Sequence, residues 1–115
     1  MEQDCIFCKI ISGNITSQII YQDGEIMVIR DINPKAPTHL LLIPKTHIAT
    51  LNDLTPAQNA LAGHLIQTAI KMANKEGIAS KGYRLIINCG REGGQEVDHL
   101  HLHVLGGRKL SGSLG

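Results

Sequence analysis

Short runs of β-branched and aliphatic residues, separated by turn residues, predict five β-strands along the chain. Residues 19–21 and 26–30 flank an Asp-Gly pair and are typical of a hairpin with a tight turn. Residues 39–44, HLLLIP, are apolar almost throughout, which favours a strand that is buried on both faces and stopped by Pro44. Two further strands are predicted in YRLIIN and HLHLHVL, joined by the glycine-rich turn CGREGGQEVD.

A different spacing of apolar residues predicts one long helix that starts at Thr55. Thr55 suits the N-cap, Pro56 the first helical position, and Gln58 completes a capping-box pattern. Gly77 lies where the helix C-cap is expected. Residues spaced by three and four positions then form one apolar stripe, made of Leu61, Leu65, Ala69, Met72 and Ala73. A second, short helical segment of one or two turns is predicted within residues 5–12, CIFCKIIS.

The order of these elements is β-β-β-α-β-β, preceded by the short helical segment. This order predicts an α+β fold, in which one long helix packs on an antiparallel sheet of about five strands and a short helix lies at the N-terminus. The chain has 115 residues and shows no internal repeat, so we expect residues 1–115 to form a single domain.

Composition and charge narrow the classes of function. Lys and Arg number 11 against 10 for Asp and Glu, so charge gives no reason to expect binding to nucleic acid or to a membrane surface. No run of about 18 apolar residues is present, and the acidic start MEQDCIFCKI does not resemble a signal peptide. Three cysteines, an odd number, favour a reducing compartment. We therefore expect a soluble, cytoplasmic protein.

The segment DHLHLHVLGG, residues 98–107, contains three of the six histidines at alternate positions. On a strand over residues 99–105, His99, His101 and His103 share one face, and the apolar residues between them can pack on the helix. The Cα atoms of His99 and His103 would lie about 13 Å apart. Zinc requires ligand nitrogens within about 2.1 Å, so a simple catalytic metal site built from all three is disfavoured.

The remaining interpretations are a solvated strand face that happens to carry imidazoles, and a catalytic array. Strict alternation beside a glycine-rich turn favours the array. Imidazole titrates near neutrality and can serve as nucleophile, base or hydrogen-bond donor. In such an array one histidine can attack a phosphorus atom while a neighbour donates to a phosphate oxygen or to the leaving group.

The segment HLHLHVL matches the histidine-triad pattern, in which His alternates with apolar residues. CIFCKIISG, RDINPKAPTHLLLIPKTHI, GYRLIINCGREGGQEVDH and HVLGGR extend the likeness from about Asp4 to Arg108. On these residues the chain resembles the histidine triad (HIT) superfamily, and within it the histidine-triad nucleotide-binding branch. The resemblance implies a homodimer whose two sheets continue across the interface. It also implies an enzyme that hydrolyses purine nucleoside 5′-monophosphoramidates, the amides of AMP or GMP, through a covalent nucleotidyl-histidine.

The resemblance also implies a role for individual residues. His101 would be the nucleophile, His103 would act at the phosphate and the leaving group, and His39 would complete the histidine cluster. Asp31 would hold the ribose hydroxyls. The phosphate side would include Asn88, Gly94 and Gln95, and the apolar base pocket Ile6, Phe7, Ile10, Ile29 and Ile32. Glu96 stands where some relatives have serine; because its carboxylate would repel phosphate, we expect it to contribute its backbone N–H.

Cys5 and Cys8, spaced as C-x-x-C, are by themselves open to three interpretations: half of a zinc site, a redox pair, or two buried small residues. Similarity to HIT proteins with the same cysteine pair implies a structural zinc held by Cys5, Cys8, His47 and His99. A closed set of four ligands leaves no open catalytic position. His64 and Cys89 have no such partners in the pattern, and we interpret both as structural or surface residues.

Two alternatives to the phosphoramidase remain open from the sequence. One is a dinucleoside polyphosphate hydrolase, the activity of a sister branch. The other is a nucleotide-binding or adaptor protein in which turnover is incidental.

Overall fold

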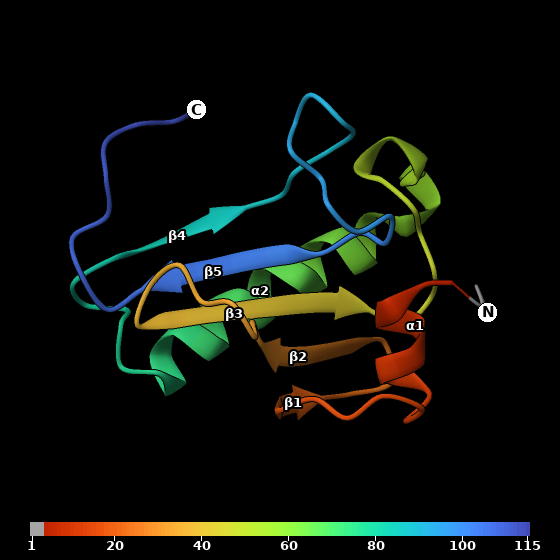
Figure 1. Ribbon diagram of the computed structural model, residues 1–115, viewed down its shortest axis with the longest axis horizontal. Helices are drawn as coiled ribbons and strands as arrows, with labels where there is room; N and C mark the ends of the chain where they lie inside the picture. Colours follow the sequence, from red (N-terminus) through yellow and green to blue (C-terminus); the bar gives the residue numbers. More distant parts are fainter. Residues whose placement is uncertain (1–3) are drawn as a thin grey trace.

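A five-stranded antiparallel sheet forms the centre of the protein (Figure 1). The structure is a computed structural model that describes residues 4–115. Its order is β1-β2-β3-β5-β4, so β1 and β4 lie at the two edges. The strands are β1 (Ile19–Gln22), β2 (Ile26–Arg30), β3 (Thr38–Pro44), β4 (Tyr83–Ile86) and β5 (Leu102–Gly106). The α+β fold, the hairpin of β1 and β2, and the element order predicted from the sequence are confirmed.

The two faces of the sheet are covered by different helices. Because side chains alternate along a strand, Val28 and Leu42 point to one face, whereas Ile29 and Leu41 point to the other. The first face is covered by the long helix α2 (Asn59–Lys75), which passes behind the sheet in Figure 1. The other face carries the short helix α1 (Ile6–Ile11). All of β3 is buried, as its apolar sequence predicts.

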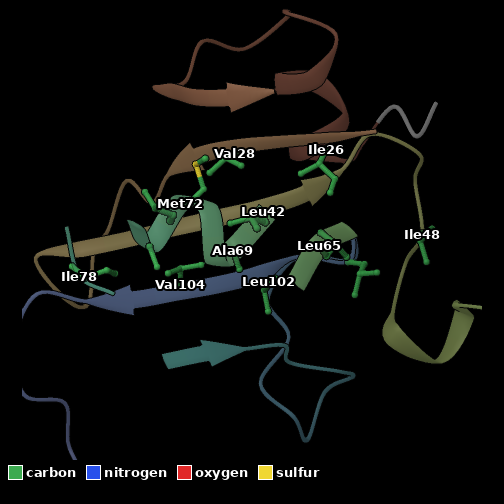
Figure 2. Close-up of a cluster of buried hydrophobic side chains, with 13 residues drawn as sticks. Ile26, Val28, Leu42, Ile48, Leu65, Ala69, Met72, Ile78, Leu102 and Val104 are labelled. Carbon is green, nitrogen blue, oxygen red and sulfur yellow. The ribbon is translucent and has the colours of Figure 1, made fainter. Parts of the chain in front are cut away.

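The larger core lies between α2 and the sheet (Figure 2). Leu65, Ala69 and Met72 of the predicted apolar stripe are buried there against Leu102 and Val104 of β5. The apolar residues of the histidine segment therefore do pack on the helix. Burial of each Leu, Val or Met side chain among them contributes about 1.5–3 kcal/mol.

The start of the long helix differs from the prediction in its geometry. Thr55 precedes a turn of 3-10 helix, η2 (Pro56–Gln58), and the α-helix begins only at Asn59. The capping box is present, because the Thr55 N–H donates to Oε1 of Gln58 over 2.9 Å. A second 3-10 turn, η1 (Leu51–Asp53), lies just before it. Tightening of the first turn into a 3-10 helix is common at helix N-termini. At the other end Gly77 has φ +74°, as expected beyond a helix C-cap.

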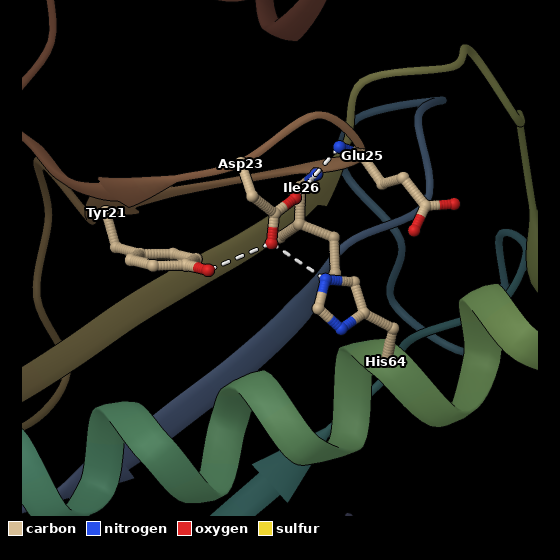
Figure 3. Close-up of polar contacts among 5 residues, drawn as sticks. All are labelled: Tyr21, Asp23, Glu25, Ile26 and His64. Atoms are coloured by element: carbon tan, nitrogen blue, oxygen red, sulfur yellow. Dashed lines mark hydrogen bonds and ion pairs between the residues drawn. The ribbon is translucent and has the colours of Figure 1, made fainter.

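Polar contacts join α2 to the hairpin of β1 and β2 (Figure 3). Oδ1 of Asp23 accepts the backbone N–H groups of Glu25 and Ile26 in the turn, at 2.8 and 2.9 Å. Oδ2 accepts the Tyr21 hydroxyl at 3.0 Å and lies 2.7 Å from Nε2 of His64 on α2. Partial burial alone would raise the pKa of Asp23, but these hydrogen bonds hold it well below its usual value. His64 is thus a structural residue, as the sequence suggested.

The histidine strand begins later than predicted. The sequence suggested a strand over residues 99–105, whereas β5 starts at Leu102. The register pairs Leu42 with Leu102, so further pairing would bring Pro44 opposite Leu100. Proline has no N–H for the ladder, and the Leu100 N–H donates instead to Ile48 O over 2.6 Å. The chain therefore joins the sheet only after His101. Within residues 4–115 no helix has the length and apolar character that crossing a membrane requires.

Candidate functional site

An open cavity of about 680 Å³ lies on the α1 face of the sheet. This volume is in the range of small-molecule pockets. Three of the predicted catalytic residues line it: His39 from β3, His101 from the segment before β5, and His103 from β5. Residues far apart in the sequence therefore meet at one cavity.

One end of the cavity is apolar. Ile6, Phe7 and Ile10 of α1 face it together with Ile29 of β2, and Asp31 lies at the end of the same strand. Phe7, Ile10 and Ile29 are buried, whereas Ile6 is half exposed. Ile32, which the resemblance placed in the base pocket, also borders the cavity but is 91% exposed, so it lies at the rim.

The glycine-rich segment also borders the cavity, through Asn88, Gly94 and Glu96. Gly93 permits its tight path, because a Cβ there would lie 2.3 Å from the Cys89 carbonyl oxygen. The Asn88 amide donates to Gly93 O over 2.7 Å, and the Gly94 N–H donates within the loop. Among the described residues no partner takes the Glu96 backbone N–H, which is the group expected to contribute there.

Gln95 does not border the cavity. Its Nε2 group donates to the carbonyl oxygens of Ala49 and Val97, at 2.8 and 2.9 Å, and its Oε1 accepts the Gly90 N–H. In this conformation its side chain holds the loop in shape. A role in contacting phosphate directly would require these hydrogen bonds to break.

The hydrogen bonds of His39 and His103 define their tautomers. The Lys35 backbone N–H donates to Nδ1 of His39 over 3.0 Å, so the proton of a neutral His39 is on Nε2. Nε2 of His39 lies 2.9 Å from Nδ1 of His103 and donates to it. Nδ1 of His103 is then an acceptor, and its proton is on Nε2. His103 can therefore present an N–H donor to a ligand in the cavity.

His101 has the opposite tautomer. Its Nδ1 lies 2.7 Å from the His99 carbonyl oxygen, to which only a protonated nitrogen can donate. In the neutral ring Nε2 then carries the lone pair. Phe7 packs edge-on against His101, with ring centroids 5.1 Å apart. The side chain is buried except for 7% of its surface, so its orientation is well defined. An acceptor nitrogen on His101 and a donor nitrogen on His103 thus border the same cavity.

Burial keeps the neighbouring imidazoles neutral. It lowers the pKa of His103 to about 4, with a smaller contribution from the positive charges that His101 and His39 would carry. Burial also lowers the pKa of His39, although Asp31, 3.4 Å from Nε2 of His39, acts in the opposite direction. Both rings are therefore uncharged at pH 7, as the tautomer assignment requires.

A second group of side chains converges beside α1: Cys5, Cys8, His47 and His99. Nδ1 of His99 lies 3.2 Å from Sγ of Cys5, 3.6 Å from Sγ of Cys8 and 3.1 Å from Nδ1 of His47. The Cys8 sulfur lies 3.4 Å from Nδ1 of His47. Ligands of a tetrahedral zinc, with bonds of about 2.0–2.3 Å, lie about 3.3–3.8 Å apart. The observed separations of 3.1–3.6 Å are close to this range.

The orientation of His99 supports the same fit. Its Nε2 lies 2.7 Å from the Pro44 carbonyl oxygen and donates to it, so Nδ1 faces the sulfur atoms as an acceptor. His99 is fully buried, and burial lowers its pKa, which keeps the ring in the neutral form that binds metal. The donor set of two thiols and two imidazoles is typical of a structural zinc site.

Asp31, His39 and His103 also lie within metal-ligating distance of one another. Here, however, hydrogen bonds account for the geometry. Nε2 of His39 carries the proton that it donates to His103, so neither facing nitrogen is left for a metal. We therefore interpret this group as a hydrogen-bonded relay.

Some groups that shape the site were not predicted from the sequence. They include the Lys35 amide and the carbonyl groups of Pro44 and His99, which select the tautomers. Backbone groups leave no signal in residue identity. Leu41 also borders the cavity, and its position two residues after His39 on β3 could have indicated this. Ile15, Thr16 and Ser17, in the loop after α1, border the cavity as well.

The fold and the site define a histidine-triad protein with a nucleotide-sized cavity and a Cys₂His₂ cluster. The HIT domain profile matches residues 12–110, and the chain belongs to this family. It is 51% identical to a purine nucleoside phosphoramidase of Escherichia coli K12 over 96% of this chain and 92% of that protein. A HIT family hydrolase from Legionella pneumophila superposes with a TM-score of 0.95 at 47% identity, covering 97% and 100% of the two chains.

A third relative bears on the cysteine-histidine cluster. It is a structure described as a zinc-bound histidine triad family protein from Mycobacterium smegmatis. It superposes with a TM-score of 0.78 at 36% identity, over 91% of this chain and 76% of that one.

Proposed function

We propose that this protein is a nucleotide hydrolase that cleaves purine nucleoside 5′-monophosphoramidates. The observation that carries the proposal is the pair of complementary tautomers at one cavity, an acceptor on His101 and a donor on His103. Attack on phosphorus needs the lone pair of the His101 acceptor nitrogen. Stabilisation of the phosphate or leaving group needs the N–H donor of His103. The identity of 51% to a purine nucleoside phosphoramidase supports the substrate class.

The reaction has two steps. Nε2 of His101 attacks the α-phosphorus, a bond forms between nitrogen and phosphorus, and the phosphorus–amine bond breaks. The amine leaves with a proton taken from solvent. The Nε2–H of His103 donates a hydrogen bond to the departing nitrogen or to a phosphate oxygen, and His39 orients His103 through the 2.9 Å hydrogen bond. Water then attacks the phosphorus, the bond between phosphorus and Nε2 of His101 breaks, and one proton of the water passes to solvent. The nucleoside monophosphate is released, and His101, which has kept its Nδ1–H, is neutral again. Splitting the displacement in this way replaces one difficult step with two easier ones.

The residues that line the cavity define an orientation for the bound nucleotide. The phosphate lies near His101 and His103 and near Asn88, Gly94 and Glu96, where N–H donors are available. Asp31 accepts the ribose hydroxyl groups, and the purine packs between α1 and Ile29. A carboxylate suits a diol because each of its oxygens can accept a hydrogen bond.

The test is hydrolysis of an AMP amide by wild-type protein and by His101→Ala. We expect the variant to lose more than about a thousandfold in kcat, the scale on which removal of a covalent nucleophile acts. His64→Ala is the matched control, because His64 lies on α2 and binds Asp23 outside the cavity. Intact-protein mass spectrometry after rapid mixing should show one added nucleotidyl group in wild type only. Hydrolysis by His101→Ala at the wild-type rate would refute the assignment.

The same assay separates the alternatives. Faster cleavage of diadenosine polyphosphates than of AMP amides would identify a dinucleoside polyphosphate hydrolase. Tight AMP binding without turnover of any phosphoramidate would identify a nucleotide-binding or adaptor protein.

We also propose that Cys5, Cys8, His47 and His99 hold a structural zinc. The convergence of four ligand atoms and the zinc-bound relative support this. The ion joins the N-terminal segment to the histidine segment and supplies no step of the reaction. Metal analysis of protein prepared without chelators should give about one zinc per chain, and a content far below this would refute the proposal. Reduced cysteines at such a site also suit a cytoplasmic protein.

A homodimer is proposed from two exposed features. β4 is an edge strand whose four residues are all only partly buried, so its free backbone groups can pair with a second copy. Ile66 and Ile70, four residues apart on α2, expose 42% and 38% of their surface. Light scattering of the purified protein should give twice the chain mass; a monomer at micromolar concentration would contradict the proposal.

A further inference from the structure

Helix α1 lies between the cysteine-histidine cluster and the cavity. It has six residues, too few to be stable as an isolated helix. Its start is defined by Cys5, whose sulfur accepts the Cys8 N–H over 3.3 Å. The two residues between these cysteines, Ile6 and Phe7, border the cavity. One short segment therefore carries both half of the metal ligands and part of the apolar wall.

The histidine segment provides a second connection between the two sites. The His99 side chain belongs to the metal cluster, while its carbonyl group accepts the Nδ1–H of His101 over 2.7 Å. Phe7 packs edge-on against both rings, with centroids 5.8 Å from His99 and 5.1 Å from His101. The orientation of the proposed nucleophile thus depends directly on His99, a member of the cluster, and on Phe7, which lies between the two cysteines in the chain.

The rest of the core does not depend on the cluster. The side chains buried between α2 and the sheet include none from α1. The cysteines, Phe7 and Ile10 pack instead in a separate core with Met27, Ile29, Leu41 and Ile43. Loss of the metal should consequently loosen the α1 face while α2 and the sheet remain folded.

We propose that Cys5 and Cys8 are positioning residues for the nucleotide site, so that zinc in the cluster and a purine nucleotide in the cavity bind cooperatively. This rests on the proposed function and goes beyond a static structural zinc. Zinc holds α1 and the His99 carbonyl in place, and the nucleotide then meets an ordered apolar wall and an oriented His101. Without zinc, nucleotide binding must also order α1, which weakens it.

Thermodynamic linkage gives the proposal a quantitative form. If zinc strengthens AMP binding by some factor, AMP must strengthen zinc binding by the same factor. Couplings between sites in proteins are typically about 5- to 150-fold. We expect a factor of at least about fivefold in both directions.

The experiment measures, on the 115-residue chain, the effect of zinc on AMP binding and the effect of AMP on zinc binding. Calorimetry gives the AMP dissociation constant of zinc-loaded and chelator-stripped protein, and competition with a chromophoric chelator gives the zinc affinity with and without saturating AMP. Hydrogen exchange of α1 and α2 amides is followed in the same samples. Cys5→Ser and Cys8→Ser should behave like the stripped protein, whereas Cys89→Ser, a thiol outside the cluster, should behave like wild type.

The expected result is equal coupling factors together with faster exchange in α1 and unchanged exchange in α2. AMP affinities that differ by less than about twofold with and without zinc overturn the proposal. A chain that binds no zinc also overturns it. So does faster exchange of α2 amides after zinc is removed, because the effect of zinc would then be on global unfolding. If the zinc-loaded protein neither binds nor cleaves any purine nucleotide, the proposed function itself fails. If it binds AMP without coupling to zinc, only the positioning role fails.

Discussion

Burial of neutral His103 should make the stability of the protein depend on pH. In the folded state the pKa of His103 is about 4, below the 6.5 expected in the unfolded chain. Between these values the unfolded chain binds the additional proton, so the free energy of unfolding falls as the pH is lowered from 6.5 towards 4. Above pH 6.5 both states are neutral at this residue, and it contributes no further pH dependence.

The magnitude follows from the two pKa values. At pH 5 the unfolded chain is almost fully protonated at this site and the folded protein hardly at all, which destabilises the folded state by about 2 kcal/mol relative to pH 7.5. The matched variant is His103→Asn, whose amide oxygen can accept from His39 in place of Nδ1 but does not titrate.

Urea unfolding of both proteins, loaded with zinc, at pH 7.5 and pH 5.0 provides the assay. Protonation of the cysteine-histidine cluster affects both proteins, so the difference between their pH responses isolates His103. Between pH 7.5 and pH 5.0 the free energy of unfolding of wild type should fall by about 2 kcal/mol more than that of His103→Asn. A difference smaller than about 0.5 kcal/mol would show that His103 is not held neutral by burial, and the reasoning would be wrong.

Four further substitutions test the fold and the site. Leu42→Ala should cost about 3–5 kcal/mol in urea unfolding, because Leu42 is fully buried between the sheet and α2. Gly107→Ala should lower the melting temperature, because φ is +95° there and a Cβ would lie 2.9 Å from Cβ of Pro37. Asp31→Asn should raise KM for an AMP amide by about 10- to 100-fold with a smaller effect on kcat, through loss of charged hydrogen bonds to ribose. His64→Ala should cost at most about 1 kcal/mol, because the pair with Asp23 is partly exposed.

Each of these expectations can fail separately. A Leu42→Ala protein as stable as wild type would contradict the described core, and an unchanged melting temperature in Gly107→Ala would contradict the close approach to Pro37. An unchanged KM in Asp31→Asn would remove this residue from the ribose site. A loss well above 1 kcal/mol in His64→Ala would mean that the pair does more than join α2 to the hairpin.

The elements could be predicted because their signals are local. The Asp-Gly turn, the uniformly apolar β3 and the caps of α2 each reflect the backbone conformations and burial that their own residues favour. The alternation in the histidine segment also placed Leu102 and Val104 in the core against α2. The match in composition and spacing to HIT proteins was dense enough to indicate the family.

Errors arose where a distant segment determines local structure. The histidine strand begins at Leu102 because Pro44, on a strand more than fifty residues earlier, cannot continue the ladder. The Gln95 side chain likewise donates to the carbonyl groups of Ala49 and Val97, contacts that its own residue type does not reveal, while its place on the phosphate side stays a prediction. Neither partner is recognisable from the residues near these positions.

The sequence by itself determined the family, the order of the elements and the residue types available for chemistry, since all three are written in local patterns and spacings. Only the tertiary structure decided what each histidine can do. His99, His101 and His103 have the same side chain, and their tautomers differ because Pro44 O, His99 O and His39 Nε2 are their respective partners. An imidazole is made a ligand, an acceptor or a donor by the group that binds its other nitrogen, and that group is brought to it by folding.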